Sequence, residues 1–139
     1  MKETFNISIK GHVTVTNDKG EVLYDDHNDL TPEAPYLLAR ALGGSISQSL
    51  AIGQGEIEAG YGAGPSYFAK QISNQIFIPT ENHITFETMF APDDFAGMIH
   101  NLSLKTTDGT IFSMVSPIEI EKFINTAINV KWKLTFNIV

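Results

Sequence analysis

The chain has 139 residues, 42% hydrophobic and 18% charged, which fits a single domain spanning residues 1–139. Its formal net charge of −7 argues against a nucleic-acid partner, because phosphate binding needs a surplus of Lys and Arg. The absence of cysteine excludes disulfides and thiolate metal sites. No apolar run approaches the ~20 residues of a membrane span, and the first residues lack an apolar signal core. We therefore expect a soluble protein made in a cytoplasm, with no membrane contact.

A β-hairpin is the first predicted element. From Phe5 to Val15 the apolar residues fall on odd positions, the period-two pattern of a strand with one buried face. Gly11 falls in the same series and predicts a bulge or a close approach, within one long strand or between two shorter ones. Residues 17–20 (Asn-Asp-Lys-Gly) predict a turn. Residues 21–26 are the expected return arm.

The polar run Asp25-Asp26-His27-Asn28-Asp29 allows two interpretations. One is a cation site, because hard cations take several carboxylate oxygens. The other is a solvated loop that leads into a helix. The spacing matches no calcium loop, and no Gly stands at the required bend, which favours the loop.

One short α-helix is predicted at residues 32–42. Thr31 is a capping residue, and Pro32 takes the first helical position, where its missing N–H costs nothing. The apolar residues that form one stripe at helical spacing are Ala34, Leu37, Leu38, Ala41 and Leu42. Gly43-Gly44 ends the helix. Because it has a single apolar face, we expect it to cover one end or edge of a sheet.

Residues 54–66 are rich in glycine and predict a long flexible loop after a short strand at 49–53. A nucleotide-binding glycine loop must open a helix, and the Gly and Pro residues that follow exclude one here. Long loops often contact partners, and aromatic side chains supply contact area. The residues predicted to take part in assembly or interaction are Gly55, Tyr61, Tyr67 and Phe68. Ordinary edge packing is an equal alternative for these aromatic residues.

The rest of the chain predicts strands joined by turns. They are expected at 71–78, 84–90, 98–104, 111–115 and 126–139, with a mixed connection at 116–125. Asp108-Gly109 is a strong hairpin signal between two of them. In the last run, the even positions from Ile128 to Ile138 are apolar, include Trp132, and alternate with polar residues. We therefore expect this strand at the centre of the core.

Together these elements predict a mainly β fold. Turn-linked strands are antiparallel neighbours. We expect an antiparallel β-sandwich, jelly-roll or Ig-like, or a flattened barrel, of roughly eight strands with one short α-helix near residues 32–42.

The sequence shows no reaction chemistry. Of the four histidines, only His100 is expected on the inward face of its strand, where a core or rim role is commoner than a ligand role. None of the four has the spacing of a common metal site. The acidic pairs at Asp93-Asp94 and Glu119/Glu121 show no arrangement of an acid/base couple. The sequence therefore predicts no enzyme and no catalytic, cofactor-binding or metal-binding residues.

Several motifs follow one another along most of the chain, from about Gly11 onward. They are Asn28-Asp29-Leu30, the Leu/Ala helix Pro35–Leu42, Ile52-Gly53-Gln54-Gly55, the Phe-rich strand Ile84–Phe90, the Asp-Gly-Thr hairpin Leu102–Phe112, Pro117-Ile118, Lys122 and the Trp-containing strand Val130–Phe136. In this order they resemble bacteriophage virion proteins, tail-fibre and tail-associated ones in particular. Similar proteins often carry Glu-Xaa-Gly-Leu where this chain has His100–Leu104, which leaves the subfamily open.

The resemblance implies a virion structural protein: a β-sandwich subunit of a tail, fibre, collar or head decoration that acts through oligomeric assembly. Its implied partners are further copies of itself and other phage virion proteins, with a host-surface glycan as another candidate. Its implied location is the virion, after synthesis in the host bacterial cytoplasm.

Two alternatives stay open at this stage. A carbohydrate-binding β-sandwich module would need an outward-facing Trp132 as an aromatic platform. A small β-barrel enzyme would need His100 and a carboxylate converging in a pocket.

Overall fold

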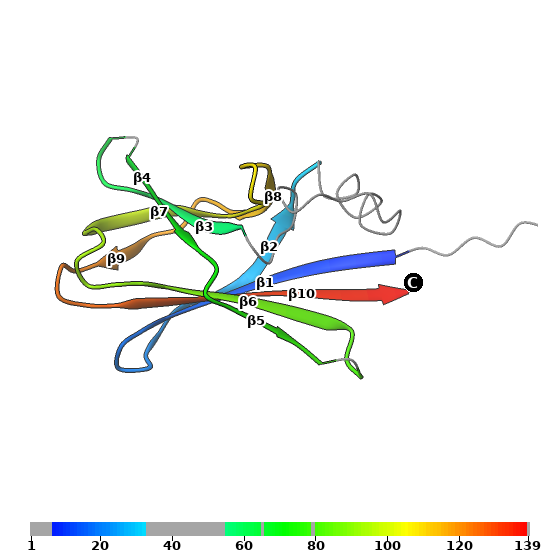
Figure 1. Ribbon diagram of the computed structural model, residues 1–139. Helices are drawn as coiled ribbons and strands as arrows, with labels where there is room; N and C mark the ends of the chain where they lie inside the picture. Colours follow the sequence, from blue (N-terminus) through cyan, green and yellow to red (C-terminus); the bar gives the residue numbers. More distant parts are fainter. Residues whose placement is uncertain (1–6, 33–54, 65, 79, 139) are drawn as a thin grey trace, which may run out of the picture.

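The computed structural model describes residues 7–32, 55–64, 66–78 and 80–138, which form ten β-strands and no helix. The strands are β1 (Ile7–Asn17), β2 (Val22–Leu30), β3 (Glu56–Tyr61), β4 (Ser66–Gln71), β5 (Asn74–Phe77), β6 (His83–Phe90), β7 (Gly97–Lys105), β8 (Ile111–Val115), β9 (Ile120–Lys122) and β10 (Ile128–Ile138) (Figure 1). Pro32 lies in a turn. The rest of the predicted helix, 33–42, and the predicted strand at 49–53 lie outside the described residues.

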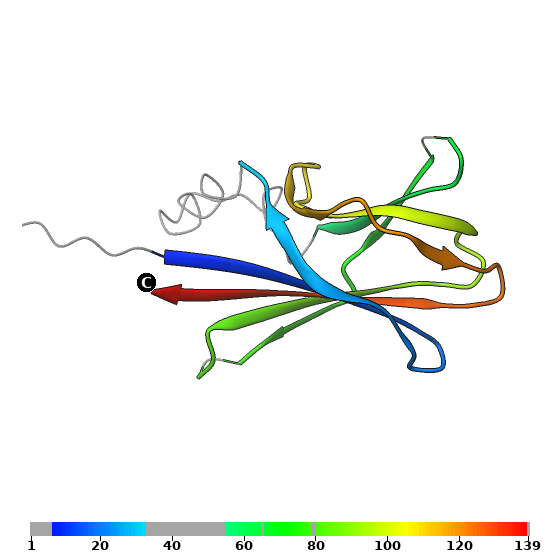
Figure 2. The same ribbon diagram turned by 180° about the vertical axis from the view of Figure 1, so that it is seen from behind.

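The strands form two antiparallel sheets that lie in two layers (Figure 1). Sheet A has the order β5-β6-β10-β1-β2, and sheet B has the order β4-β3-β7-β8-β2, with β9 also paired to β7. β2 belongs to both sheets, because its first part pairs with β1 whereas Asp29 and Leu30 pair with β8. Figure 2 shows β2 passing from one layer to the other. The predicted mainly β, antiparallel architecture is therefore confirmed.

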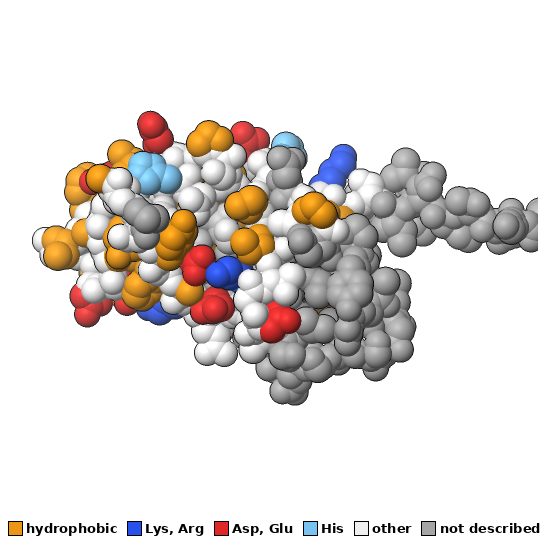
Figure 3. All heavy atoms as spheres, turned by 90° about the horizontal axis from the view of Figure 1, so that it is seen from above, with side chains coloured by type: hydrophobic (Ala, Val, Ile, Leu, Met, Phe, Trp, Pro, Cys, Tyr) orange, Lys and Arg blue, Asp and Glu red, His pale blue; other side chains and the backbone are white. Residues whose placement is uncertain are grey.

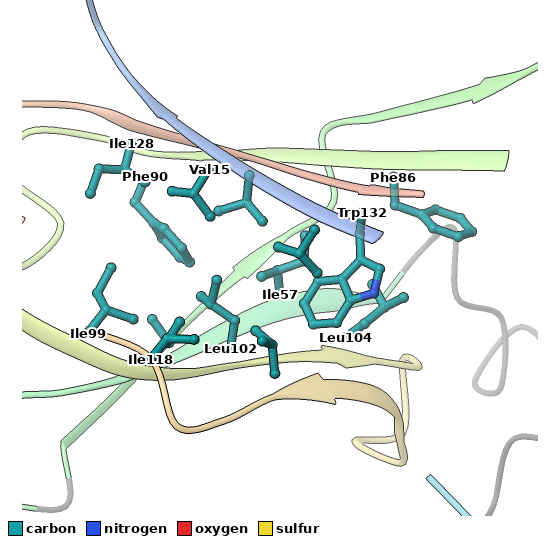
Figure 4. Close-up of a cluster of buried hydrophobic side chains, with 14 of the residues drawn as sticks. Val15, Ile57, Phe86, Phe90, Ile99, Leu102, Leu104, Ile118, Ile128 and Trp132 are labelled. Carbon is teal, nitrogen blue, oxygen red and sulfur yellow. The ribbon is translucent and has the colours of Figure 1, made fainter. Parts of the chain in front are cut away.

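The facing sides of the two sheets form one hydrophobic core (Figure 4). β10 lies between β1 and β6 in the middle of sheet A. Its even positions from Ile128 to Leu134 are buried as predicted, with at most 1% exposure for Ile128, Val130, Trp132 and Leu134, and Phe136 is partly buried. Sheet B supplies the other side of the core, and its large apolar side chains with 0% exposure are Ile57, Ile99, Leu102 and Leu104. The Trp132 ring lies among these side chains in Figure 4.

The prediction of a long loop at 54–66 is wrong for residues 56–61, which form β3. This strand is hydrogen-bonded to β4 on one side and to β7 on the other. Ile57 and Ala59 are fully buried and alternate with Glu56 and Glu58, a short strand pattern that the surrounding glycines obscure. Gly60 is required for close packing, because a Cβ there would come within 2.7 Å of the Asn101 side chain.

The acidic stretch is also a strand and not a loop, since residues 25–29 continue β2. Asp25 pairs opposite Thr14 and Asp26 opposite Val13, so their side chains alternate to different faces of the sheet. The described residues contain no group of three or more His, Asp or Glu that would hold a metal ion. Such alternation prevents neighbouring carboxylates from converging on one cation.

His100 is exposed, and its predicted inward position is wrong. In the pairing of β3 with β7, Gly60 is opposite Asn101 and Tyr61 is opposite Ile99, which leaves His100 as an extra residue. This bulge shifts the alternation by one position, so that Ile99 points into the core together with Leu102. A bulge of this kind leaves no clear mark in the sequence.

β1 is one continuous strand, which resolves the two alternatives at Gly11. The close approach expected there comes from a side chain: a Cβ on Gly11 would lie 2.2 Å from Asn28 Oδ1.

Both predicted hairpin turns are confirmed. Gly20 and Gly109 have φ of 78° and 90°, in the left-handed region that glycine adopts without strain. The predicted set of roughly eight strands lacks β3, β4 and β9.

Replacing Trp132 tests its central position. We expect Trp132→Ala to lower the free energy of unfolding by about 3–5 kcal/mol, because a large cavity opens between the sheets. Trp132→Phe should cost clearly less, since the indole N–H has no hydrogen-bond partner among the described residues. Equilibrium unfolding in urea measures both. The control is Lys133→Ala, an exposed neighbour on the opposite face, with a change within about 0.5 kcal/mol. Equal losses for the Trp132→Ala and Lys133→Ala variants would contradict this position.

Candidate functional site

The four residues predicted for interaction do not form one surface. Gly55 is buried, Tyr61 and Phe68 are half-buried, and only Tyr67 is well exposed, at 59%. Tyr61 stacks on Phe95 with 4.4 Å between ring centroids. Tyr61 and Phe68 therefore follow the edge-packing alternative, and contact between Tyr67 and a partner stays a prediction.

An aromatic cluster fixes the connection between β6 and β7, residues 91–96. Phe95 in this connection is 7% exposed, and its ring lies 5.4 Å from that of Phe68 and 5.3 Å from that of Phe90. Aromatic pairs at these distances add to the free energy of burial. The connection is thus held against β4 and β6 and has little freedom to move.

A buried lysine ties a second loop to the same connection. Lys122, at the end of β9, is 0% exposed. Its Nζ donates hydrogen bonds to the carbonyl oxygens of Pro92 at 3.1 Å and Phe95 at 2.8 Å. The ammonium group also lies 5.2 Å from the centroid of the Phe95 ring, a cation–π distance. No described carboxylate forms an ion pair with Lys122, so two backbone carbonyls and a ring face compensate for its lost hydration.

The charges around Lys122 are arranged in a short network. Burial lowers the pKa of Lys122, whereas the carboxylates of Asp94 and Asp93 oppose this shift. Burial would raise the pKa of Asp94, but hydrogen bonds from Lys70 Nζ at 2.6 Å and the Ala91 N–H at 2.7 Å outweigh it and hold this pKa below its usual value. The carboxylate of Asp94 therefore stays ionised and fixes the start of the 91–96 connection.

Two adjacent apolar side chains follow Lys122 directly and face solvent. Phe123 and Ile124, which we name the apolar tip, are 62% and 65% exposed. The Phe123 carbonyl accepts hydrogen bonds from the Thr126 N–H at 3.1 Å and from Thr126 Oγ1 at 3.0 Å, which close the turn. In Figure 3, apolar side chains gather toward the end of the molecule that carries this loop and the 91–96 connection. The tip is thus an exposed apolar feature on a fixed base.

β5 offers a second apolar surface. It is the outermost strand of sheet A and pairs only with β6 among the described strands. Phe77 is 60% exposed, and Ile76 and Ile78 are 38% and 40% exposed. The strand has no charged residue or proline of the kind that usually protects an edge from pairing with another chain.

The residues on which the two alternative functions were expected to depend are placed differently in the structure. Trp132 is buried and cannot offer a ring face to a sugar. His100 Nε2 lies 2.9 Å from the carbonyl oxygen of Gly62, and no described carboxylate pairs with it. A groove of about 390 Å³ where β2 meets β8 has Tyr24 and His27 among its described lining residues.

Sequence reasoning named Lys122 only as part of a motif and did not predict its burial, and it missed the apolar tip. The signal that would have found Lys122 is short: Ile118, Ile120 and Lys122 fall on alternate positions and are all buried. A lysine at the end of such a series is normally expected in solvent. Its burial depends on carbonyl groups that come from a loop about 30 residues earlier in the chain.

Comparisons of the chain with protein-family models, with curated proteins and with solved structures gave no match. The described residues form no helix of the length and hydropathy needed to cross a membrane.

Lys122→Met tests the link between the two loops. Met fills a similar volume but leaves the Pro92 and Phe95 carbonyls without this donor, so we expect a loss of about 1–3 kcal/mol in the free energy of unfolding at neutral pH. Urea unfolding measures it, with the exposed Lys133→Met as the matched control. An unchanged stability of the Lys122→Met variant would show that the two hydrogen bonds contribute nothing.

The lowered pKa of Lys122 predicts that the stability difference between wild type and Lys122→Met depends on pH. Folding lowers the pKa of Lys122, so between the folded-state pKa and the ordinary lysine value of about 10.4 the unfolded chain binds more protons. The free energy of unfolding contributed by this group therefore rises with pH across that window. We expect the stability difference between wild type and Lys122→Met to widen in favour of wild type as the pH increases. If the stability difference narrows or stays constant in urea titrations at alkaline pH, the lowered pKa of Lys122 is contradicted.

Proposed function

We propose that this protein is a structural subunit of a bacteriophage virion, in a tail, fibre, collar or head decoration, and that it acts through oligomeric assembly. The proposal has two supports: the ordered motifs that resemble virion proteins, and a surface whose main features are apolar contacts. Its partners are other copies of the chain and other virion proteins. Its location is the virion after synthesis in the host cytoplasm.

The observation that carries the assembly role is the apolar tip on its fixed base. Association costs less when the contacting side chains are already held in place, because less conformational freedom is lost. The buried Lys122 ammonium and the Thr126 hydrogen bonds hold Phe123 and Ile124 in solvent before any partner arrives. Adjacent exposed apolar residues on a monomeric domain commonly mark an interaction site.

The fold is suited to a subunit that is repeated in a symmetric assembly. A two-layer β fold of the sandwich or flattened-barrel type is rigid, and oligomeric virion parts need rigid surfaces in repeated contact. The outer edge of β5, where no described strand pairs, supplies a second, different surface, with Phe77 at its end. Two distinct surfaces allow one subunit to contact two neighbours.

Light scattering across a concentration series tests the assembly role. We expect wild type to reach a defined oligomer, and the double variant Phe123→Ala/Ile124→Ala to need at least about tenfold higher concentration, as when interface hot spots are removed. The matched control is Met89→Ala/Met114→Ala, which truncates two exposed apolar residues elsewhere, at 44% and 37% exposure. This control should assemble like wild type.

A monomeric wild type at all concentrations, or equal weakening in both double variants, would contradict the role of the tip. Circular dichroism of each variant shows that the fold is retained. The virion assignment is tested separately by mass spectrometry of gradient-purified particles of the phage that encodes the chain, where we expect a stoichiometric amount. Its absence from such particles would overturn the assignment.

A further inference from the structure

The outward face of sheet A gathers four basic side chains from three neighbouring strands. His12 on β1 is directly opposite Lys133 on β10 and opposite His27 on β2. The two imidazole rings lie 5.1 Å apart in an edge-to-face arrangement. Lys10 stands two residues before His12, and therefore on the same face of β1. Only the pairing of strands brings these four residues together.

Among the described residues, the two lysines of this cluster take part in no ion pair. Lys10 and Lys133 are exposed and pair with no described carboxylate. Lys131, the next lysine on this face of β10, pairs with Glu87 at 3.9 Å. The chain as a whole has a net charge of −7, so two exposed lysines without a described carboxylate partner are a local concentration of positive charge. Such charges favour the approach of an anion.

Two hollows lie beside these side chains. They measure about 290 and 310 Å³ and share Lys10, Gly11 and His27 among their linings. They arise because β2 pairs with β1 only as far as Gly11 and Asn28, and then leaves for sheet B. The larger hollow is also lined by His12, Lys133 and Thr135, so the basic side chains border a space that a small ligand can enter.

We propose that the cluster of Lys10, His12, His27 and Lys133 binds a phosphate group. A phosphate presents acceptor oxygens in several directions, which suits donors that come from three strands around one hollow. Lysine ammonium groups supply point charges, and a protonated imidazole donates through either ring nitrogen. This inference does not depend on the assembly role, because none of its residues belongs to the apolar tip or to β5.

An acidic side chain also contacts the cluster. Asp25 on β2 is the nearest acidic group: its carboxylate is hydrogen-bonded to His12 Nε2 and to Thr14 Oγ1 at 3.1 Å. These hydrogen bonds lower the pKa of Asp25 and keep it ionised. Beyond it, Lys131 and Glu87 form a pair of opposite charges.

Asp25 orients one imidazole and leaves the other for the ligand. His12 shares its Nε2 with the Asp25 carboxylate, whereas His27 borders both hollows. Asp26 alternates to the other face of β2 and does not border either hollow. His27 is therefore the imidazole that lies beside a ligand in either hollow.

Titration of the full chain with phosphate, followed by the NMR signals of the histidine rings, tests the proposal. At one fixed pH we expect saturable shifts of the His12 and His27 signals. Lys10→Ala/Lys133→Ala should weaken binding by about three- to fivefold for each lysine removed. The control is Lys19→Ala, an exposed lysine in the turn between β1 and β2, which should bind like wild type.

Two probes distinguish the sources of a phosphate group. Inorganic phosphate represents a free ion or a terminal ester, and dimethyl phosphate represents the diester of a polymer. Binding of either probe supports the site. The probe that binds more tightly identifies the source of the phosphate group. Sodium chloride at matched ionic strength must not reproduce the shifts. Linear shifts without saturation, equal effects of chloride, or equal binding by the double variant and Lys19→Ala would overturn the proposal.

Discussion

The burial of one face of β10 is the constraint on which the rest of the fold depends. Its alternate side chains, with Trp132 in the middle, can leave water only if a second apolar layer covers them. That layer is sheet B, and β2 completes the arrangement because it belongs to both sheets. The outward positions of the same strand are freed for polar residues such as Lys133. The alternation of apolar and polar residues along β10 thus determines which of its side chains enter the core and which face solvent.

Lys122 shows how a buried polar group can fix the position of exposed side chains. Its ammonium is removed from water and retains only two carbonyl partners and the Phe95 ring. Burial of a charge is costly unless such partners are fixed, so the 91–96 connection and the end of β9 must keep their relative positions. The exposed side chains that follow, Phe123 and Ile124, take their rigidity from this buried contact.

The apolar tip and the basic cluster differ in chemistry and belong to different elements. The apolar tip extends from the loop between β9 and β10, whereas the basic cluster lies on the outward face of β1, β2 and β10. Apolar contact suits a protein neighbour, and a cationic hollow suits a small anionic group. A variant of either surface should therefore change one property without the other, since the residues share no direct contact in their described hydrogen bonds and ion pairs.

The sequence by itself determined the strands with unbroken alternation, the two glycine turns and the mainly antiparallel class, because these depend on local periodicity and backbone preference. It did not determine β3, where glycines required for close packing resemble those of a loop, or the bulge that turns His100 outward. The tertiary structure alone decided the burial of Lys122 and the gathering of Lys10, His12, His27 and Lys133. Each of these depends on partners far away in the chain, and strand pairing across such distances leaves no local pattern in the residues themselves.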